Sequence, residues 1–330
     1  MIITRTPLRI SFFGGGTDLP AYYMEHGGAV LSTTIDKYQY ISCRKLAPWW
    51  EYKHQLRYGS ALETVNEFDE IKHPSIRETM RFFNIQYGLD LHYNTDVPAR
   101  SGMGSSSAFT VGLVNALYGL DGKMAGKKRL ASEAIHIEQD MIGEAVGDQD
   151  QIAAAFGGLN YITFKQGGGF FVSPVTLKKK RKQALEDHLV LIFSGFQRFA
   201  TDIEKEKIKT IGDKTASLKQ MSEMTETALD ILTSDRDITE FGRLLNQSWE
   251  LKKSLSGKVS TSEIDRIYET GLANGAAGGK LLGAGGGGFM LFFCEPDKQP
   301  ALLASLKNYL HIPFHFENNG SQVIYYREED

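Results

Sequence analysis

Pro98-Ala99-Arg100-Ser101-Gly102-Met103-Gly104-Ser105-Ser106-Ser107-Ala108 joins two segments of opposite character. Before it, Leu89, Leu91 and Tyr93 alternate with polar residues, which predicts a strand, and the apolar run 108–120 after it predicts a helix. Glycines let a backbone approach an anion closely, and a helix start offers unpaired N–H groups and a positive dipole end. The stretch therefore predicts either a phosphate-binding loop or a capped helix after a glycine turn, and by itself leaves both open.

Two familiar phosphate motifs are excluded. A dinucleotide-binding fingerprint needs a third glycine, but Ser107 stands where it should follow Gly102 and Gly104. A P-loop fails around Lys280, because Asn274 occupies its first glycine position and Leu281 follows the lysine in place of serine or threonine.

The composition is that of a globular protein with one large domain or two ordinary ones. The chain has 330 residues, 42% of them hydrophobic and 23% charged, and a net charge of −3, which argues against a nucleic-acid partner. Cys43 and Cys294 lie in apolar, strand-like surroundings and are predicted to be buried thiols, which suits a reducing compartment. The N-terminus lacks the pattern of a signal peptide, and no run of about 20 apolar residues predicts a membrane span. We therefore expect a cytoplasmic protein without a membrane partner.

The order of elements predicts an α+β fold, rich in strands in the first half and in helices in the second. Expected strands cover 2–13, 28–46, 161–164, 189–193, 289–294 and 321–326. Expected helices cover 75–83, 108–120, 127–145, 148–155, most of 203–274, and 298–309. The basic run 178–182 is expected to be a solvated loop at a domain boundary.

Two acidic residues are candidates for chemistry. Glu138 adjoins the apolar stripe of the helix expected over 127–145, so its carboxylate is partly buried and needs an ion-pair partner or a metal. Asp150 begins a short helix, where it either caps the helix or acts on a ligand; Asp148 is better placed to be the cap.

Two further segments combine glycines with charged residues. Residues 9–18 join a strand, a glycine turn and an acid. Residues 280–288 place five glycines before a buried strand, which either a ligand in close backbone contact or a tight turn would explain.

Taken together, these motifs resemble one family. Pro-x-Arg…Gly-Gly-Thr-Asp (7–18), Pro-x-x-Ser-Gly-Met-Gly-Ser-Ser-Ser-Ala (98–108) and Lys-Leu-Leu-Gly-Ala-Gly-Gly-Gly-Gly (280–288) resemble, in order, the three motifs of the GHMP small-molecule kinases. That superfamily includes galactokinase, homoserine kinase, mevalonate kinase and phosphomevalonate kinase. Residues 13–23 and 148–158 look most like the D-glycero-D-manno-heptose 7-phosphate kinases.

The resemblance implies a fold and a reaction. The fold would be the two-domain GHMP kinase fold, with an ATP-binding N-terminal domain like ribosomal protein S5 domain 2 (1–183) and a ferredoxin-like C-terminal domain (184–330). The active site would lie between them. The enzyme would use ATP and Mg²⁺ to phosphorylate the anomeric hydroxyl of D-glycero-D-manno-heptose 7-phosphate, a sugar-phosphate partner, giving the 1,7-bisphosphate used for nucleotide-activated heptose.

The resemblance also implies residue roles. Asp150 matches the aspartate that accepts a proton from, or orients, the attacking hydroxyl, and Arg9 matches a basic residue near the transferred phosphoryl group. Ser106 and Glu138 match the residues that bind Mg²⁺. ATP phosphates would be wrapped by Arg100, Ser101, Gly102, Met103, Gly104, Ser105, Ser106 and Ser107. Substrate would contact Gly15, Gly16, Thr17 and Asp18, with Gly285, Gly286 and Gly287 closing over it. Arg198 and Arg44 are candidates to hold the second phosphate of the substrate.

Two alternatives remain at this stage. One is a kinase of another sugar of the fucose, galactose or hexosamine type, which needs no cationic contacts for a second phosphate. The other is a sensor that binds sugar and ATP without turnover, although the set of Ser106, Glu138 and Asp150 favours an enzyme.

Overall fold

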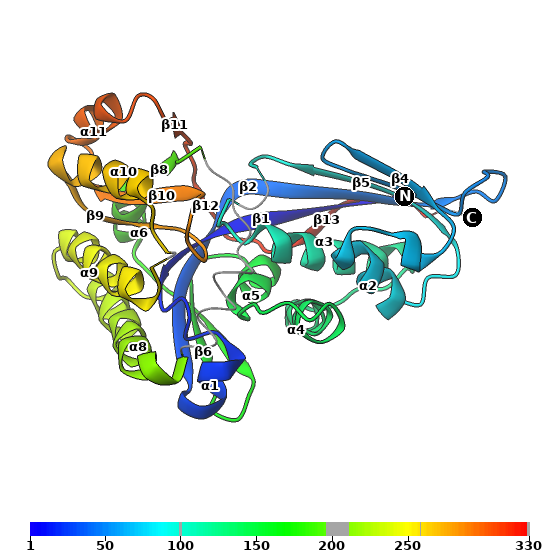
Figure 1. Cartoon of the computed structure of the whole chain (residues 1–330), viewed down its shortest axis with the longest axis horizontal. Helices are drawn as coiled ribbons and strands as arrows, with labels where there is room; N and C mark the ends of the chain where they lie inside the picture. Colours follow the sequence, from blue (N-terminus) through cyan, green and yellow to red (C-terminus); the bar gives the residue numbers. More distant parts are fainter. Residues whose placement is uncertain (99–100, 196–210, 258, 329–330) are drawn as a thin grey trace.

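A long antiparallel pair of strands forms the centre of the molecule. The computed structural model describes residues 1–98, 101–195, 211–257 and 259–328. Strands β1 (Ile2–Phe13) and β2 (Gly28–Leu46) pair from Ile2 opposite Cys43 to Phe13 opposite Leu31. Their β-branched and aromatic residues favour extended backbone, and the bounds match those expected from the sequence. Figure 1 shows these strands linking the two halves of the molecule.

Nine of the described strands form the first sheet around this pair. Its main path is β13-β1-β2-β5-β3-β4; in addition, β6 and β12 pair with β2, and β7 pairs with β6. The remaining bounds are β3 (His54–Tyr58), β4 (Ala61–Val65), β5 (Gly88–Thr95), β6 (Asn160–Phe164), β7 (Phe170–Pro174), β12 (Phe316–Glu317) and β13 (Gln322–Tyr326). Strands β12 and β13 come from the end of the chain, so the last residues complete the N-terminal sheet.

Helices cover one side of the first sheet (Figure 1). Helix α3 (Ser105–Leu120) packs directly on β1 and β2, and its side chains are buried almost all round, which explains its lack of a polar stripe. The neighbouring helices are α1 (Pro20–His26), α2 (Pro74–Phe82), α4 (Lys127–His136) and α5 (Gln149–Phe156), with 3-10 turn η1 (Phe68–Glu70) and π-helix η2 (Ile137–Met141).

A second, antiparallel sheet has the order β11-β8-β10-β9. It consists of β8 (Leu189–Phe193), β9 (Ala276–Leu281), β10 (Phe289–Cys294) and β11 (Leu310–His311), with helices α6 (Lys179–Asp187), α8 (Ile211–Thr233), α9 (Thr239–Leu255), α10 (Ser262–Ala273) and α11 (Gln299–Ser305) around it. All six residues of β10 are buried, as its apolar sequence predicts.

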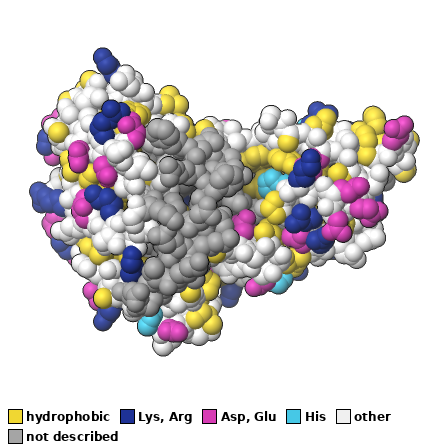
Figure 2. All heavy atoms as spheres, viewed as in Figure 1, with side chains coloured by type: hydrophobic (Ala, Val, Ile, Leu, Met, Phe, Trp, Pro, Cys, Tyr) yellow, Lys and Arg dark blue, Asp and Glu magenta, His cyan; other side chains and the backbone are white. Residues whose placement is uncertain are grey.

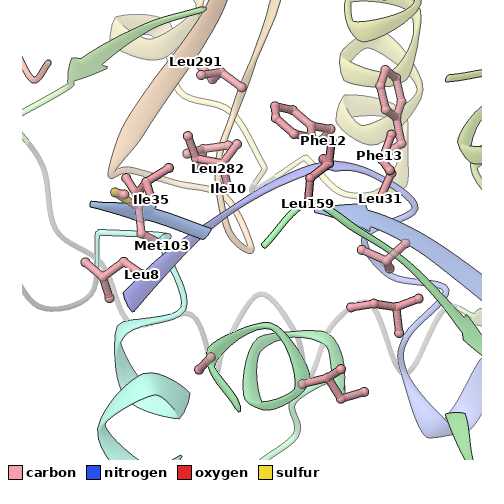
Figure 3. Close-up of a cluster of buried hydrophobic side chains, with 14 of the residues drawn as sticks. Leu8, Ile10, Phe12, Phe13, Leu31, Ile35, Met103, Leu159, Leu282 and Leu291 are labelled. Atoms are coloured by element: carbon pink, nitrogen blue, oxygen red, sulfur yellow. The ribbon is translucent and has the colours of Figure 1, made fainter. Parts of the chain in front are cut away.

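One hydrophobic core joins the two sheets (Figure 3). The ring of Phe241 lies 5.4 Å from Phe12, 5.1 Å from Phe13 and 6.0 Å from Phe293, measured between centroids, so it connects β1 with β10. This arrangement confirms the predicted α+β class. In Figure 2, charged side chains of both signs are interspersed over the described part of the face shown.

The structure differs from the sequence-based expectations at two places. Most of the basic run 178–182 forms the first turn of α6 and is not a loop, because Leu185 is buried and Arg181 donates to carbonyls at the end of α8. The helix expected over 127–145 changes at Ile137 into η2. The predicted burial of Cys43 and Cys294 is confirmed, and both are free thiols. Within the described ranges, none of the helices combines the length and the apolar character needed to cross a membrane.

Candidate active site

Arg9 and Asp150 form an ion pair at the centre of the candidate site. Arg9 lies on β1 and Asp150 in the first turn of α5, and the Arg9 Nε and Nη2 atoms donate to the two Asp150 oxygens at 2.7 and 2.8 Å. The third Arg9 nitrogen, Nη1, donates to the Gly102 carbonyl at 2.6 Å. Bidentate charge-assisted bonds of this kind fix geometry strongly. Arg9 therefore connects strand, helix and the glycine-serine loop.

The glycine-serine loop lies directly beside this pair. A Cβ atom on Gly104 would lie 3.2 Å from Arg9 Cγ and 3.3 Å from Asp150 Oδ2, so the glycine lets the loop approach the acid. Gly104 is the residue before α3 and has a left-handed φ of +71°, and no side chain caps the helix start there. The positive dipole end of α3 thus lies beside Asp150 without a side-chain cap, an arrangement that favours an anion there.

The hydrophobic core holds the glycine-serine loop in place through Met103. Met103 is fully buried against Leu8, Ile35 and Leu282 (Figure 3), so only its backbone is available to a ligand. Gln39 on β2 donates to the Ser105 carbonyl at 2.8 Å. Ser105 and Ser107 are buried, whereas Ser106 is exposed.

Glu138 is completely buried beside the start of α3. Its Oε2 accepts hydrogen bonds from Ser107 Oγ at 2.9 Å and Gln151 Nε2 at 2.6 Å. Within the described residues its other oxygen, Oε1, has no partner. Burial raises the pKa of Glu138 to about 7.

This arrangement fits a Mg²⁺ ion. Carboxylate and hydroxyl oxygens are suitable hard ligands, and the unpartnered Oε1 offers one of them. The described part of the chain contains no group of three or more Asp, Glu, His or Cys side chains placed for a metal. That is compatible with Mg²⁺, which commonly uses one or two protein ligands together with substrate phosphates and water. The serine bonded to Glu138 is Ser107, a residue that the sequence assigned to phosphate binding.

The glycine turn between β1 and α1 is held by its own polar residues. Asp18 accepts from Gly16 N at 2.7 Å and, more weakly, from Gln149 N at 3.4 Å. Thr17 donates to the Gly14 and Ala29 carbonyls at 2.8 and 2.9 Å. Thr17 and Asp18 thus shape the turn and attach it to the start of α5.

Asp148 occupies the N-cap position of α5, as expected from the sequence, but its side chain does not cap the helix. Its side chain makes no cap bond to α5, because its two oxygens accept from Tyr23 Oη at 2.8 Å and Gln139 Nε2 at 2.6 Å. Burial raises the pKa of Asp148. The N–H group of Gln149 instead faces the Asp18 carboxylate, from another segment of the chain.

The late glycine loop packs backbone against backbone on the phosphate loop. A Cβ on Gly283 would lie 2.5 Å from Gly102 Cα, and one on Gly288 would lie 2.3 Å from the Ser101 carbonyl oxygen. Phe289 N donates to that same carbonyl at 3.1 Å. Gly283 and Gly288 are therefore required by contact between two protein loops. The sequence had suggested only a ligand or a tight turn as the reason for these glycines.

Two buried lysines support the same region. Lys252 Nζ, on α9, donates to the carbonyls of Leu281 and Gly283. Lys280 Nζ donates to the Phe12 carbonyl at 2.7 Å. Both tie the second sheet to the site, and neither was identified as functional from the sequence.

Three arginines of the sequence-based proposal are not part of the described site. Arg100 and Arg198 lie outside the described residues. Arg44 pairs with Asp90 at 2.7 Å, ten residues along β2 from Thr34, the cross-strand neighbour of Arg9. Because β2 bulges between Ile35 and Tyr38, the separation is taken along β1, where Ile2, the partner of Cys43, lies seven residues or about 23 Å from Arg9. Arg44 is therefore too distant to hold a substrate phosphate, and that suggestion is wrong.

Sequence comparison identifies relatives over nearly the whole chain. The family models "GHMP kinases N terminal domain" and "GHMP kinases C terminal" match residues 71–158 and 226–312. A D-glycero-alpha-D-manno-heptose 7-phosphate kinase of Campylobacter jejuni is 33% identical over 320 residues, 93% of each chain. An L-fucokinase/L-fucose-1-P guanylyltransferase of Bacteroides fragilis is 26% identical over 90% of this chain and 35% of its own.

Solved structures agree on the fold. A D-glycero-D-manno-heptose 1-phosphate kinase from Bacteroides thetaiotaomicron superposes with a TM-score of 0.82 at 23% identity, covering 99% of this chain and 100% of its own. A sugar kinase structure from Campylobacter jejuni, titled as putative, gives a TM-score of 0.72 at 29% identity over 98% of this chain and 97% of its own.

Proposed function

The chain belongs to the GHMP kinase family and is a sugar kinase, and from this premise we propose that its substrate is D-glycero-D-manno-heptose 7-phosphate. The anomeric oxygen attacks the γ-phosphorus of ATP, and the bond from that phosphorus to the bridging oxygen breaks. The products are the 1,7-bisphosphate, ADP and the proton of the hydroxyl. The relative from Campylobacter jejuni, which is 33% identical over 93% of the chain, supports this choice of sugar.

The observation that carries the mechanism is the position of Asp150 beside the phosphate loop. Its Oδ2 lies 3.3 Å from the Cβ position of Gly104, so a hydroxyl bonded to Asp150 lies next to phosphates bound at the start of α3. Asp150 accepts the proton or orients the hydroxyl, and Arg9 fixes the carboxylate and places positive charge near the transferred group.

The other roles follow from the loops. Backbone groups of residues 101–107, and the side chain of the exposed Ser106, bind the ATP phosphates. Residues 285–287 are expected to lie over these phosphates; they are buried, and Gly286 N donates to the Val259 carbonyl at 2.9 Å. Glu138 and Ser106 would hold Mg²⁺, while Ser107 and Gln151 orient the Glu138 carboxylate. When bound, Mg²⁺ neutralises charge on the phosphates. Gly15 and Gly16 contact the sugar through the turn that Thr17 and Asp18 shape.

The test is consumption of ATP with a panel of sugars and sugar phosphates, followed by phosphorus NMR of the products. We expect a new anomeric phosphate with heptose 7-phosphate and little turnover with free fucose, galactose or hexosamines. Preferred turnover of one of those sugars would overturn the substrate while keeping the kinase. Binding of ATP without turnover of any sugar would favour a sensor.

Asp150→Asn tests the mechanism, with Asp140→Asn as the matched control because Asp140 is an exposed acid on η2 paired with His136. We expect D150N to lose turnover by at least a hundredfold while still binding ATP. D140N is expected to behave as the unchanged protein. Near-normal turnover in D150N would show that Asp150 has been assigned wrongly.

A further inference from the structure

Gly15 is a glycine that neither backbone strain nor crowding explains. Its neighbours Gly14 and Gly16 have φ values of +85° and +103°, which L side chains rarely adopt, whereas Gly15 has no such conformation. The atoms nearest to a Cβ on Gly15 would be Gln149 Nε2 at 3.6 Å and Ser11 Oγ at 3.9 Å, which are ordinary contact distances. A small side chain would therefore fit, and its absence leaves a space between these two polar groups.

In the described part of the chain, each of these two side chains has one polar atom without a hydrogen-bond partner. Ser11 is only 6% exposed, and among the described residues its Oγ is buried without a partner. The same holds for Oε1 of Gln149. The Gln149 atom nearest to Gly15 is Nε2, and the unpartnered atom is Oε1 of the same amide. Buried polar atoms are nearly always hydrogen-bonded, so the unpartnered Ser11 hydroxyl and Gln149 amide oxygen indicate that something else supplies the bonds.

Ser11 and Gln149 belong to the same two elements as the catalytic pair. Ser11 follows Arg9 by two residues on β1, so both side chains lie on the same face of the strand. Gln149 directly precedes Asp150 at the start of α5. Gly15 itself is partly accessible, unlike the buried Gly14 before it and Thr17 two residues after it. A sugar whose reacting hydroxyl meets Asp150 would place further hydroxyls beside Gly15.

We propose that Ser11 and Gln149 bind two hydroxyl groups of the sugar in the space beside Gly15 and thereby determine which sugars are accepted. A serine hydroxyl both donates and accepts, and the glutamine amide offers one acceptor and two donors, so together they suit a polyhydroxy ligand. The inference rests on the proposed function only in that the acceptor is a sugar; it does not require heptose.

The experiment measures kcat and KM for the sugar and for ATP in Ser11→Ala, Gln149→Ala and Gly15→Ala. The sugar is heptose 7-phosphate or, if the panel selects another, the one that the unchanged chain phosphorylates. We expect S11A and Q149A each to lower kcat/KM for the sugar about three- to tenfold, the effect of one hydrogen bond. G15A fills the space with a methyl group and is expected to lower it about tenfold or more.

A purely structural role predicts a different pattern. Loss of packing would lower the unfolding midpoint and would raise the KM for ATP together with the KM for the sugar. We expect instead an unchanged unfolding midpoint and a KM for ATP within twofold of that of the unchanged protein. Gly126→Ala is the matched control, because nothing lies within 4 Å of its Cβ position and it has an ordinary φ.

The proposed substrate and the proposed role of Ser11 and Gln149 can be refuted independently. Turnover of a sugar other than heptose 7-phosphate removes the proposed substrate but leaves this inference to be tested on that sugar. Unchanged kcat/KM for the sugar in all three variants, or equal rises in the KM for sugar and for ATP, would overturn it even if heptose 7-phosphate is the substrate. A chain that phosphorylates no sugar would overturn both.

Discussion

Replacing Arg9 by methionine should destabilise the protein as well as inactivate it. Arg9 is 4% exposed and makes three short bonds, two to Asp150 and one to the Gly102 carbonyl. Removing one partner of a buried ion pair costs about 3–5 kcal/mol, because the other charge remains without compensation. The Asp150 side chain is 24% exposed, so water can partly replace the arginine. We therefore expect the lower end, about 3 kcal/mol, or roughly a hundredfold in the ratio of folded to unfolded protein.

The conservative and the double variants separate charge from geometry. Arg9→Lys keeps the charge but cannot form the bidentate pair, so we expect it to cost about 1–2 kcal/mol. Arg9→Met with Asp150→Asn removes both charges, so its cost should be well below the sum of the single costs.

Denaturant unfolding at neutral pH, followed by fluorescence and circular dichroism, measures these free energies. Coincident curves from the two probes are required for a two-state analysis. An R9M variant that unfolds at the same denaturant concentration as the unchanged protein would refute the reasoning. So would strict additivity in the double variant, because it would mean that Arg9 and Asp150 do not interact.

Three further predictions concern the loops and the first sheet. Gly288→Ala should abolish ATP binding measured by calorimetry, because its Cβ would lie 2.3 Å from the Ser101 carbonyl oxygen. Gly168→Ala should bind normally, because its φ of +108° is close to the +112° of Gly288 and its Cβ would make only ordinary contacts with Met24. Lys252→Met should raise the KM for ATP about tenfold by releasing two loop carbonyls, with the adjacent Lys253→Met as the control; equal effects would contradict a positioning role. His54 is buried, accepts a hydrogen bond from Leu89 N, and has its pKa lowered from 6.5 to about 4 by burial, so the unfolded chain takes up the proton first as the pH falls. The stability due to neutral His54 is therefore present above pH 6.5 and lost towards pH 4, and between pH 7 and 5 unfolding should become easier by about 2 kcal/mol more than in His54→Asn. Parallel pH profiles of the two proteins would show that His54 does not contribute.

The sequence predicted most elements because their patterns are local. The bounds of β1, β2, β8 and β10 follow from runs of β-branched and apolar residues, and those of α5 are off by only one residue at each end. The return of β13 to the first sheet was not predictable in this way. Pairing between Ile2 and Tyr326 joins the two ends of the chain, and no local pattern carries that information.

The roles within the serine run show a second limit. The helix expected from Ala108 begins at Ser105, so all three serines lie in its first turn. Successive helical residues point about 100° apart, so the point at which the helix begins decides which serine faces Glu138. The structure turns Ser107 inward to Glu138 and leaves Ser106 exposed. Loop composition could indicate phosphate binding, but it could not distinguish one serine from the next.

The glycine loops show a third limit of prediction from the sequence. A glycine required by a ligand and one required by a neighbouring backbone look the same in a sequence. Gly283 and Gly288 are explained by contact with Gly102 and Ser101, so the phosphate loop is shaped by a segment that belongs to the other sheet. Gly15 has no such contact: the atoms nearest to its Cβ position are Gln149 Nε2 and Ser11 Oγ, and among the described residues Ser11 Oγ has no hydrogen-bond partner. Glycines that the protein itself does not require are therefore the ones to examine for ligand contact, and S11A, Q149A and G15A test that inference directly.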